Sequence, residues 1–199
     1  MSFDPLFLLM AVFILWIPGY LFYTADMYER VHNVHGSNGL PVGRLLITWQ
    51  HWLDGVRGFC GAYLLFEHTF PLERALADHS YYVELGVLGC ILLVGICAQV
   101  LYYQIQCHLY ALAPVFFLIG ISFAMVDWWI VLFGMVSGLI FGRMINTSEA
   151  FFVIMAVVIG VVGLVFLGLN FEVYLVCALL ILPVILSFLI HENLVVAHR

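Results

Sequence analysis

Hydrophobic runs separated by short polar stretches recur along almost the whole chain, from Phe3 to Ile190. The hydrocarbon core of a bilayer is about 30 Å thick, so a helix rising about 1.5 Å per residue needs on the order of 20 apolar residues to cross it. This length requirement divides the chain into candidate membrane-spanning helices. Four of them are bounded by polar residues, namely 5–23, 83–103, 150–169 and 173–190.

A longer apolar run covers residues 109–144 and is interrupted only at Asp127-Trp128-Trp129. As a single helix this run would be roughly 50 Å long, too long for a bilayer without strong tilt. The aspartate can form a turn or cap a helix, and tryptophan side chains suit the membrane interface. We therefore expect two helices here, 109–126 and 128–144.

The second hydrophobic segment, residues 45–66, is long enough to cross a membrane but carries polar side chains. At about 100° of rotation per residue, several of them fall on one narrow face together with Gly61. We call the following residues the polar stripe: Gln50, His51, Asp54 and Arg57. The opposite face is apolar and aromatic, and it consists of Leu45, Trp49, Trp52, Val56, Phe59 and Tyr63.

This amphipathic segment has two structural interpretations. It can span the membrane with the polar stripe turned into the bundle, which gives about seven helices, or it can lie in the membrane plane, which leaves six. With seven helices and the N-terminus outside, the cytoplasmic arginines would be Arg30, Arg44, Arg143 and Arg199. With six, Arg143 and Arg199 would move outside. The excess of basic residues in cytoplasmic loops favours the spanning interpretation.

The composition agrees with a membrane protein, because 65% of the residues are apolar and 9% are charged. Soluble domains have roughly 45–50% and about 25%, respectively. The prediction is an all-α, polytopic helical bundle forming one transmembrane domain, 1–199. We expect it in the bacterial inner membrane with bound lipids and a cytoplasmic C-terminus. The acidic net charge of −6 disfavours nucleic acid, and the absence of lysine excludes Schiff-base chemistry on lysine.

Asp54 and Arg57 lie three residues apart on one helical face, a spacing that permits an ion pair. Pairing lowers the free energy needed to place either charge in a membrane, and charged residues there usually face protein or water. The pair can therefore belong to a polar path, with Gln99 as a further candidate, or to a docking contact for another subunit. In the in-plane interpretation, both charges would simply be solvated among the headgroups.

A ladder of glycines, Gly134, Gly138 and Gly142, repeats every four residues in the segment 128–144. Glycines at this spacing remove side chains from one helix face, so that another helix backbone can approach closely. We expect this ladder to pack within the chain, and packing against a partner is the alternative.

Histidine residues raise the question of a metal or haem site, although no cofactor is predicted. His32 and His35 form a His-x-x-His pair, but acidic or cysteine partners at metal-site spacing are missing nearby. His51 lies within a predicted span, and with seven helices His108 lies near the cytoplasmic membrane face. A haem b held by these two histidines is therefore a low-ranking hypothesis. The simpler interpretation places the pair at 32 and 35 in a loop.

The sequence offers little for an enzyme. Ser122 and Ser137 lack a histidine base at comparable depth, and Thr147 or Ser148 followed by Glu149 is typical of a helix N-terminus. The leading hypothesis is therefore a non-enzymatic membrane subunit that scaffolds or anchors a larger complex of membrane proteins. The alternative is a small transporter or an ion or proton channel whose path follows the polar stripe. A haem-binding redox subunit ranks third.

Overall fold

The computed structural model describes residues 4–18, 49–69, 81–105, 108–145, 147–190 and 194–195. Within these ranges the chain forms seven α-helices: α1 (Pro5–Trp16), α4 (Trp49–Tyr63), α6 (Tyr81–Val100), α7 (Val115–Met125), α8 (Trp128–Ile145), α9 (Ser148–Leu167) and α10 (Phe171–Ile190). The chain continues from α4 into a π-helical segment, η2 (Leu64–Thr69). Three short strands complete the described elements: β1 (Leu101–Ile105), β2 (His108–Leu112) and β3 (Leu194–Val195).

The prediction of a helical membrane bundle is confirmed. Three helices, α8, α9 and α10, are long and apolar enough to cross a membrane. Shorter apolar helices cover Pro5–Trp16, Gly86–Val100 and Val115–Met125. The bundle carries large apolar side chains on its outer surface, such as Phe166 and Phe188, as expected for a surface that lipid covers.

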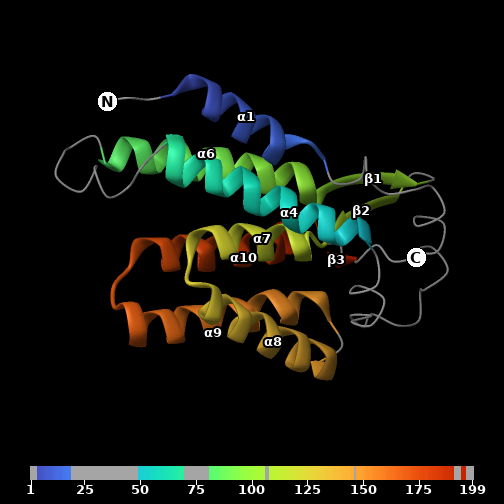
Figure 1. Cartoon of the computed structure of the whole chain (residues 1–199). Helices are drawn as coiled ribbons and strands as arrows, with labels where there is room; N and C mark the ends of the chain where they lie inside the picture. The colour runs from blue at the N-terminus through green and yellow to red at the C-terminus, as the bar shows by residue number, and fades with distance from the viewer. Residues whose placement is uncertain are drawn as a thin grey trace.

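The helices are stacked in four layers (Figure 1): α1 alone, then α4 with α6, then α7 with α10, and finally α8 with α9. The helix α7 therefore lies between α4 on one side and α8 on the other, and it also packs against α10. Most of its residues are buried: Val115, Phe116, Phe117, Leu118, Ile119, Gly120, Ile121, Ser122 and Met125. A helix that is apolar on all its faces suits a protein core or a membrane span, and α7 occupies the core of the bundle.

Glycines bring α4 and α7 into backbone contact. A Cβ atom added to Gly120 would overlap the carbonyl oxygen of Gly55 and would lie 2.8 Å from the amide nitrogen of Phe59. A Cβ atom on Gly58 would overlap the carbonyl oxygen of Phe117. The two backbones approach this closely only because these positions have no side chains. The close approach places the polar stripe of α4 directly beside the central helix.

Prolines shorten two of the predicted helices. The segment predicted as 5–23 is helical to Trp16, because Ile17 precedes Pro18 and adopts a non-helical conformation with φ −59° and ψ 120°. Residues 19–23 lie outside the described ranges. The segment predicted as 109–126 becomes helical only at Val115, directly after Pro114. Proline is favoured at helix starts because its missing N–H would have no partner there.

Residues 101–105 and 108–112 form two paired strands instead of the helix ends expected at 103 and 109. The strand β1 pairs with β2 in antiparallel orientation, with Tyr103 opposite Tyr110. The strand β3 pairs with β2 in parallel orientation, with Ala111 opposite Leu194. This three-stranded sheet lies at the end of the bundle where α1 ends (Figure 1). The local run Leu-Tyr-Tyr-Gln-Ile is rich in residues that suit strands, which explains why the helix stops at Val100.

The predicted break at Asp127 separates α7 from α8. The exposed Asp127 starts α8 through its backbone carbonyl, which accepts a hydrogen bond from the amide of Ile130 at 3.0 Å. At the next connection, the Thr147 hydroxyl caps α9 by accepting a hydrogen bond from the amide of Ala150 at 3.3 Å. Glu149 lies in the first turn of α9, and its carboxylate accepts a hydrogen bond from the amide of Leu194 at 2.7 Å.

The glycine ladder faces α9. A Cβ atom on Gly134 would lie 2.6 Å from Ile159, and Cβ atoms on Gly138 and Gly142 would lie 3.0 and 3.1 Å from Phe151. The buried side chains of Phe151 and Ile159 thus fill the space that the glycines leave open. The ladder serves packing between two helices of the same chain.

Candidate functional site: a buried polar cluster on α4

The helix α4 is polar on the side that faces the protein and apolar on its outer side. All four residues of the polar stripe are buried: Gln50, His51, Asp54 and Arg57. Asp54 is 7% exposed, whereas Trp49 on the outer side is 59% exposed. Further exposed residues of α4 are Trp52, Leu53, Val56, Phe59, Cys60 and Tyr63. This distribution is the inverse of that in a water-soluble amphipathic helix.

An ion pair between Asp54 and Arg57 forms the centre of the polar stripe. An Nη2 donor of Arg57 lies 2.8 Å from Oδ1 of Asp54, and both side chains are shielded from solvent. The helical spacing of three residues places the two groups on the same face, as the sequence predicts. Because an isolated buried charge is strongly unfavourable, the pairing makes it possible to bury both groups.

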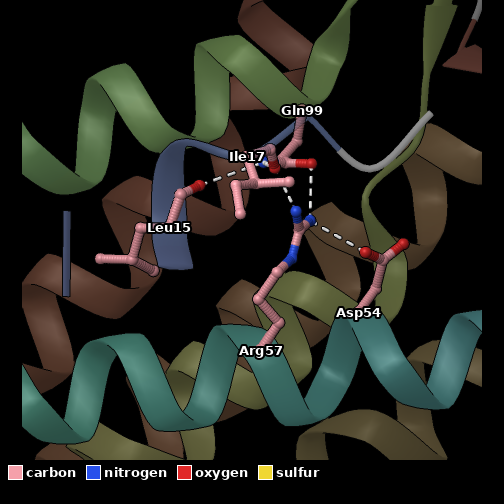
Figure 2. Close-up of polar contacts among 5 residues, drawn as sticks. All are labelled: Leu15, Ile17, Asp54, Arg57 and Gln99. Atoms are coloured by element: carbon pink, nitrogen blue, oxygen red, sulfur yellow. Dashed lines mark hydrogen bonds and ion pairs between the residues drawn. The ribbon is translucent and has the colours of Figure 1, made fainter. Parts of the chain in front are cut away.

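Gln99 from α6 joins this pair. Its side-chain oxygen accepts a hydrogen bond from Nη2 of Arg57 at 2.8 Å. Its side-chain nitrogen donates to the carbonyl oxygens of Leu15 and Ile17, at 3.1 and 2.8 Å. One amide side chain therefore connects the guanidinium of α4 with the end of α1 (Figure 2).

The C-terminal end of α1 supplies further acceptors. Nη1 of Arg57 donates to the carbonyl oxygen of Ile17, the residue that directly follows α1. The last carbonyl groups of a helix lack partners within the helix and carry a partial negative charge. Arg57 and Gln99 satisfy these groups from neighbouring helices, and Figure 2 shows both side chains converging on them. This contact replaces the local cap that Pro18 prevents.

The helix α7 closes the remaining side of the guanidinium. Cζ of Arg57 lies 5.1 Å from the centre of the Phe117 ring, a distance at which a cation is attracted to an aromatic face. Phe117 is among the most deeply buried side chains. Because Gly58 lets the backbone of Phe117 approach α4, the close packing of glycines also sets this contact.

One turn before Asp54, the residues Gln50 and His51 are buried as well. The His51 ring is stacked on Phe116 of α7, with the ring centres 5.6 Å apart and an angle of 16° between the planes. Among the described residues, no donor reaches Oε1 of Gln50. A buried amide oxygen without a donor is unfavourable by about 1–3 kcal/mol, so this position is suited to a bound water or ligand.

We use the term polar cluster for the following group: Gln50, His51, Asp54, Arg57, Gln99 and the carbonyl groups of Leu15 and Ile17. The periodicity of α4 predicts Gln50, Asp54 and Arg57 on one face, and His51 and Gln99 are further candidates from the sequence. The carbonyl groups were missed, although Pro18 marks the place where a helix must end inside an apolar segment. Phe117 carries no signal, because nothing distinguishes it from other phenylalanines in the sequence.

The other candidates lie elsewhere. His32 and His35 fall outside the described residues, and His108 begins β2, where its side chain is not described. Among the described residues, no group of three or more histidine, cysteine or acidic side chains is placed to hold a metal ion. The Ser122 hydroxyl donates to the carbonyl oxygen of Leu118 at 2.8 Å within α7, and Ser137 is half-buried on α8.

The fold and this cluster define a class of protein: an α-helical membrane bundle with a charged cluster buried between α1, α4, α6 and α7. No family model, curated protein or solved structure matches the chain.

Proposed function

We propose that the protein is a small membrane transporter or channel for protons or small cations, with the polar cluster as part of its path. The observation that carries this proposal is the orientation of α4, whose charged face is covered by helices of the same chain. Ionisable residues within membrane segments typically mark ion or substrate pathways.

The same orientation supports a membrane-spanning α4 and hence the arrangement with seven spans. A helix lying in the membrane plane keeps its charged face among headgroups and water and buries its apolar face. In α4, however, Trp49 and Val56 on the apolar face are exposed, while Asp54 and Arg57 are covered. This distribution suits a helix that is surrounded by lipid on one side and by protein on the other.

Two short helices next to the cluster also favour a transport function. α1 ends at Trp16, beside Gln99 and Arg57, and α7 begins at Val115 and covers only 11 residues. Transporters often build their binding sites from helices that are interrupted within the membrane, because the free backbone groups at the break can bind ions or polar substrates. The end of α1 presents such carbonyl groups to the cluster.

The transport proposal can be tested by flux into proteoliposomes. We expect the wild type to carry protons or a small cation and the Asp54→Asn variant to fall to the rate of empty liposomes, because the carboxylate that balances Arg57 is lost. Asp127→Asn is the matched control, since Asp127 is exposed at the start of α8 and should leave the flux unchanged. Equal flux in both variants and the wild type would exclude the polar cluster from the path.

A scaffold subunit, favoured from the sequence, remains the second proposal. It is supported by the outward face of α4, where large aromatic side chains are exposed: Trp49, Trp52, Phe59 and Tyr63. Aromatic residues are enriched at protein interfaces. The polar stripe and the glycine ladder, by contrast, are both used within the chain, which ranks this proposal below transport. We propose the bacterial inner membrane as location in either case, with the N-terminus outside.

For the scaffold proposal, purification in mild detergent followed by mass spectrometry should recover companion membrane proteins in stoichiometric amounts. A Trp49→Ala variant should lose them, because this ring is 59% exposed on the outer face of α4. A wild-type chain that is monodisperse and active in flux without companions would contradict a scaffold role.

A further inference from the structure

We propose that the surroundings of the Arg57 guanidinium form a binding site for a small organic cation of the guanidinium or primary ammonium type. In the structure, Arg57 occupies this site itself, as a tethered cation. The inference deepens the proposed transport function by naming a substrate class. Transport of this cation rests on the proposed function, whereas the binding site rests on the geometry alone.

The first observation is the number of oxygen atoms that meet at one cation. The guanidinium donates to Oδ1 of Asp54, Oε1 of Gln99 and the carbonyl oxygen of Ile17. These acceptors come from three separate segments, namely α4, α6 and the end of α1. Such convergence of acceptors suits a group with several N–H donors, as guanidinium and ammonium groups have.

The second observation is the aromatic wall. The ring of Phe117 lies on the guanidinium at 5.1 Å, as a fourth neighbour beside the three oxygen acceptors. Organic cations are commonly recognised by a combination of oxygen acceptors and an aromatic face. A flat guanidinium fits this combination better than a spherical ion, because it can donate in its plane and stack on its face.

The third observation is electrostatic. The site carries the full negative charge of Asp54 and the partial negative charge at the C-terminal end of α1. Gln99 fixes the carbonyl groups at this helix end, because its amide nitrogen donates hydrogen bonds to the carbonyl oxygens of Leu15 and Ile17. All of these acceptors remain in place when Arg57 moves away, since none of them belongs to Arg57, and a second cation that binds there keeps Asp54 ionised.

These observations imply competition between Arg57 and a free cation. A ligand can enter only when the Arg57 side chain leaves, so its apparent affinity for the wild type is reduced by the small fraction of molecules with an open site. Truncation of Arg57 should remove this competition and leave the oxygen atoms and the Phe117 ring without their cation.

The test is chemical rescue of an Arg57→Ala variant, with thermal unfolding in detergent as the readout. We expect the variant to melt roughly 5–15 °C below the wild type, because Asp54 loses its partner. Guanidinium or methylguanidinium chloride at about 10 mM, far below the molar range that denatures proteins, should restore at least half of this loss with saturation. Sodium chloride and tetramethylammonium chloride at the same ionic strength should not, since neither donates N–H hydrogen bonds.

Two controls identify the site. The wild type should not be stabilised by the same salts, because Arg57 fills the site. The double variant Asp54→Asn/Arg57→Ala should lose most of the rescue, because the carboxylate that attracts the cation is gone. Equal rescue by sodium, by tetramethylammonium or in the double variant would overturn the proposal, as would the absence of any rescue.

An Arg57→Met variant serves if Arg57→Ala cannot be purified as a folded protein, because methionine keeps much of the volume of the arginine stem. Binding of radiolabelled methylguanidinium to either variant is then measured directly, and no saturable binding would overturn the proposal. Flux is measured separately with wild-type liposomes. Binding without flux would refute transport and keep the site, whereas flux of protons alone, without binding, would refute the site and keep transport.

Discussion

Replacing Gly120 by alanine is expected to lower the free energy of unfolding by about 3 kcal/mol or more, toward or beyond the upper end of typical overpacking. The new Cβ atom would overlap the carbonyl oxygen of Gly55 and crowd the amide nitrogen of Phe59. Both neighbours are backbone atoms of α4, which cannot rotate away as a flexible side chain can. The helices α4 and α7 must therefore separate, and the packing of Phe117 on Arg57 is lost with them.

The matched control is Gly89→Ala on α6. No atom lies within 4 Å of a Cβ atom added to Gly89, so this variant should keep its stability or gain up to about 1 kcal/mol from the higher helix propensity of alanine. Both variants are compared by reversible denaturant unfolding in the same detergent, followed by circular dichroism. Equal stability of the two variants would contradict the close approach of α4 and α7.

Helix packing through glycines was only partly predictable from the sequence. The ladder of Gly134, Gly138 and Gly142 is visible because its spacing repeats along one helix. The contact at Gly120 is not visible in this way. Its partner Gly55 lies far away in the sequence, and a single glycine on a helix gives no periodic pattern. Only the structure shows that these two positions meet.

The polar stripe was predictable because a helix repeats every 3.6 residues or so, which places Gln50, Asp54 and Arg57 on one face. The sequence does not determine what covers that face. Two of the elements that do so, the end of α1 and the start of α7, follow from the backbone restrictions at Pro18 and Pro114. The apolar runs alone predict longer helices than the structure contains, because hydropathy measures affinity for lipid and not the local backbone conformation.

The residues 101–112 show the same limitation. Their apolar and aromatic side chains agree with the continuation of a membrane helix and also with strands. The hairpin of β1 and β2 satisfies the backbone groups through pairing between strands, and β3 adds a further pairing from the C-terminal part of the chain. Because this pairing partner lies some 80 residues away in the chain, local periodicity could not predict it.

The ion pair in the polar cluster should show a characteristic order of stability in a double-mutant cycle. Asp54→Asn leaves a guanidinium that cannot lose its proton without a counter-ion, and we expect a loss of about 3–5 kcal/mol in the free energy of unfolding. Arg57→Met should be less harmful, because an unpaired carboxyl group can take up a proton and become neutral. The double variant Asp54→Asn/Arg57→Met contains no charge and should be more stable than Asp54→Asn alone.

The cycle also separates the ion pair from the other contacts of Arg57. The double variant should not regain wild-type stability, because the carbonyl oxygen of Ile17 and the Oε1 atom of Gln99 still lack their donor. The stability that the double variant lacks relative to the wild type measures these other contacts of Arg57. The coupling energy of the cycle measures the ion pair between Asp54 and Arg57. Strictly additive effects of the two single substitutions in denaturant unfolding would contradict an energetic coupling between Asp54 and Arg57.

Because the two side chains lie on one helix three residues apart, a coupling of only about 0.2–0.5 kcal/mol would indicate a pair that water screens, as on an exposed helix surface. A coupling several times larger would instead indicate a pair in a water-poor interior, the environment that a membrane-spanning α4 requires.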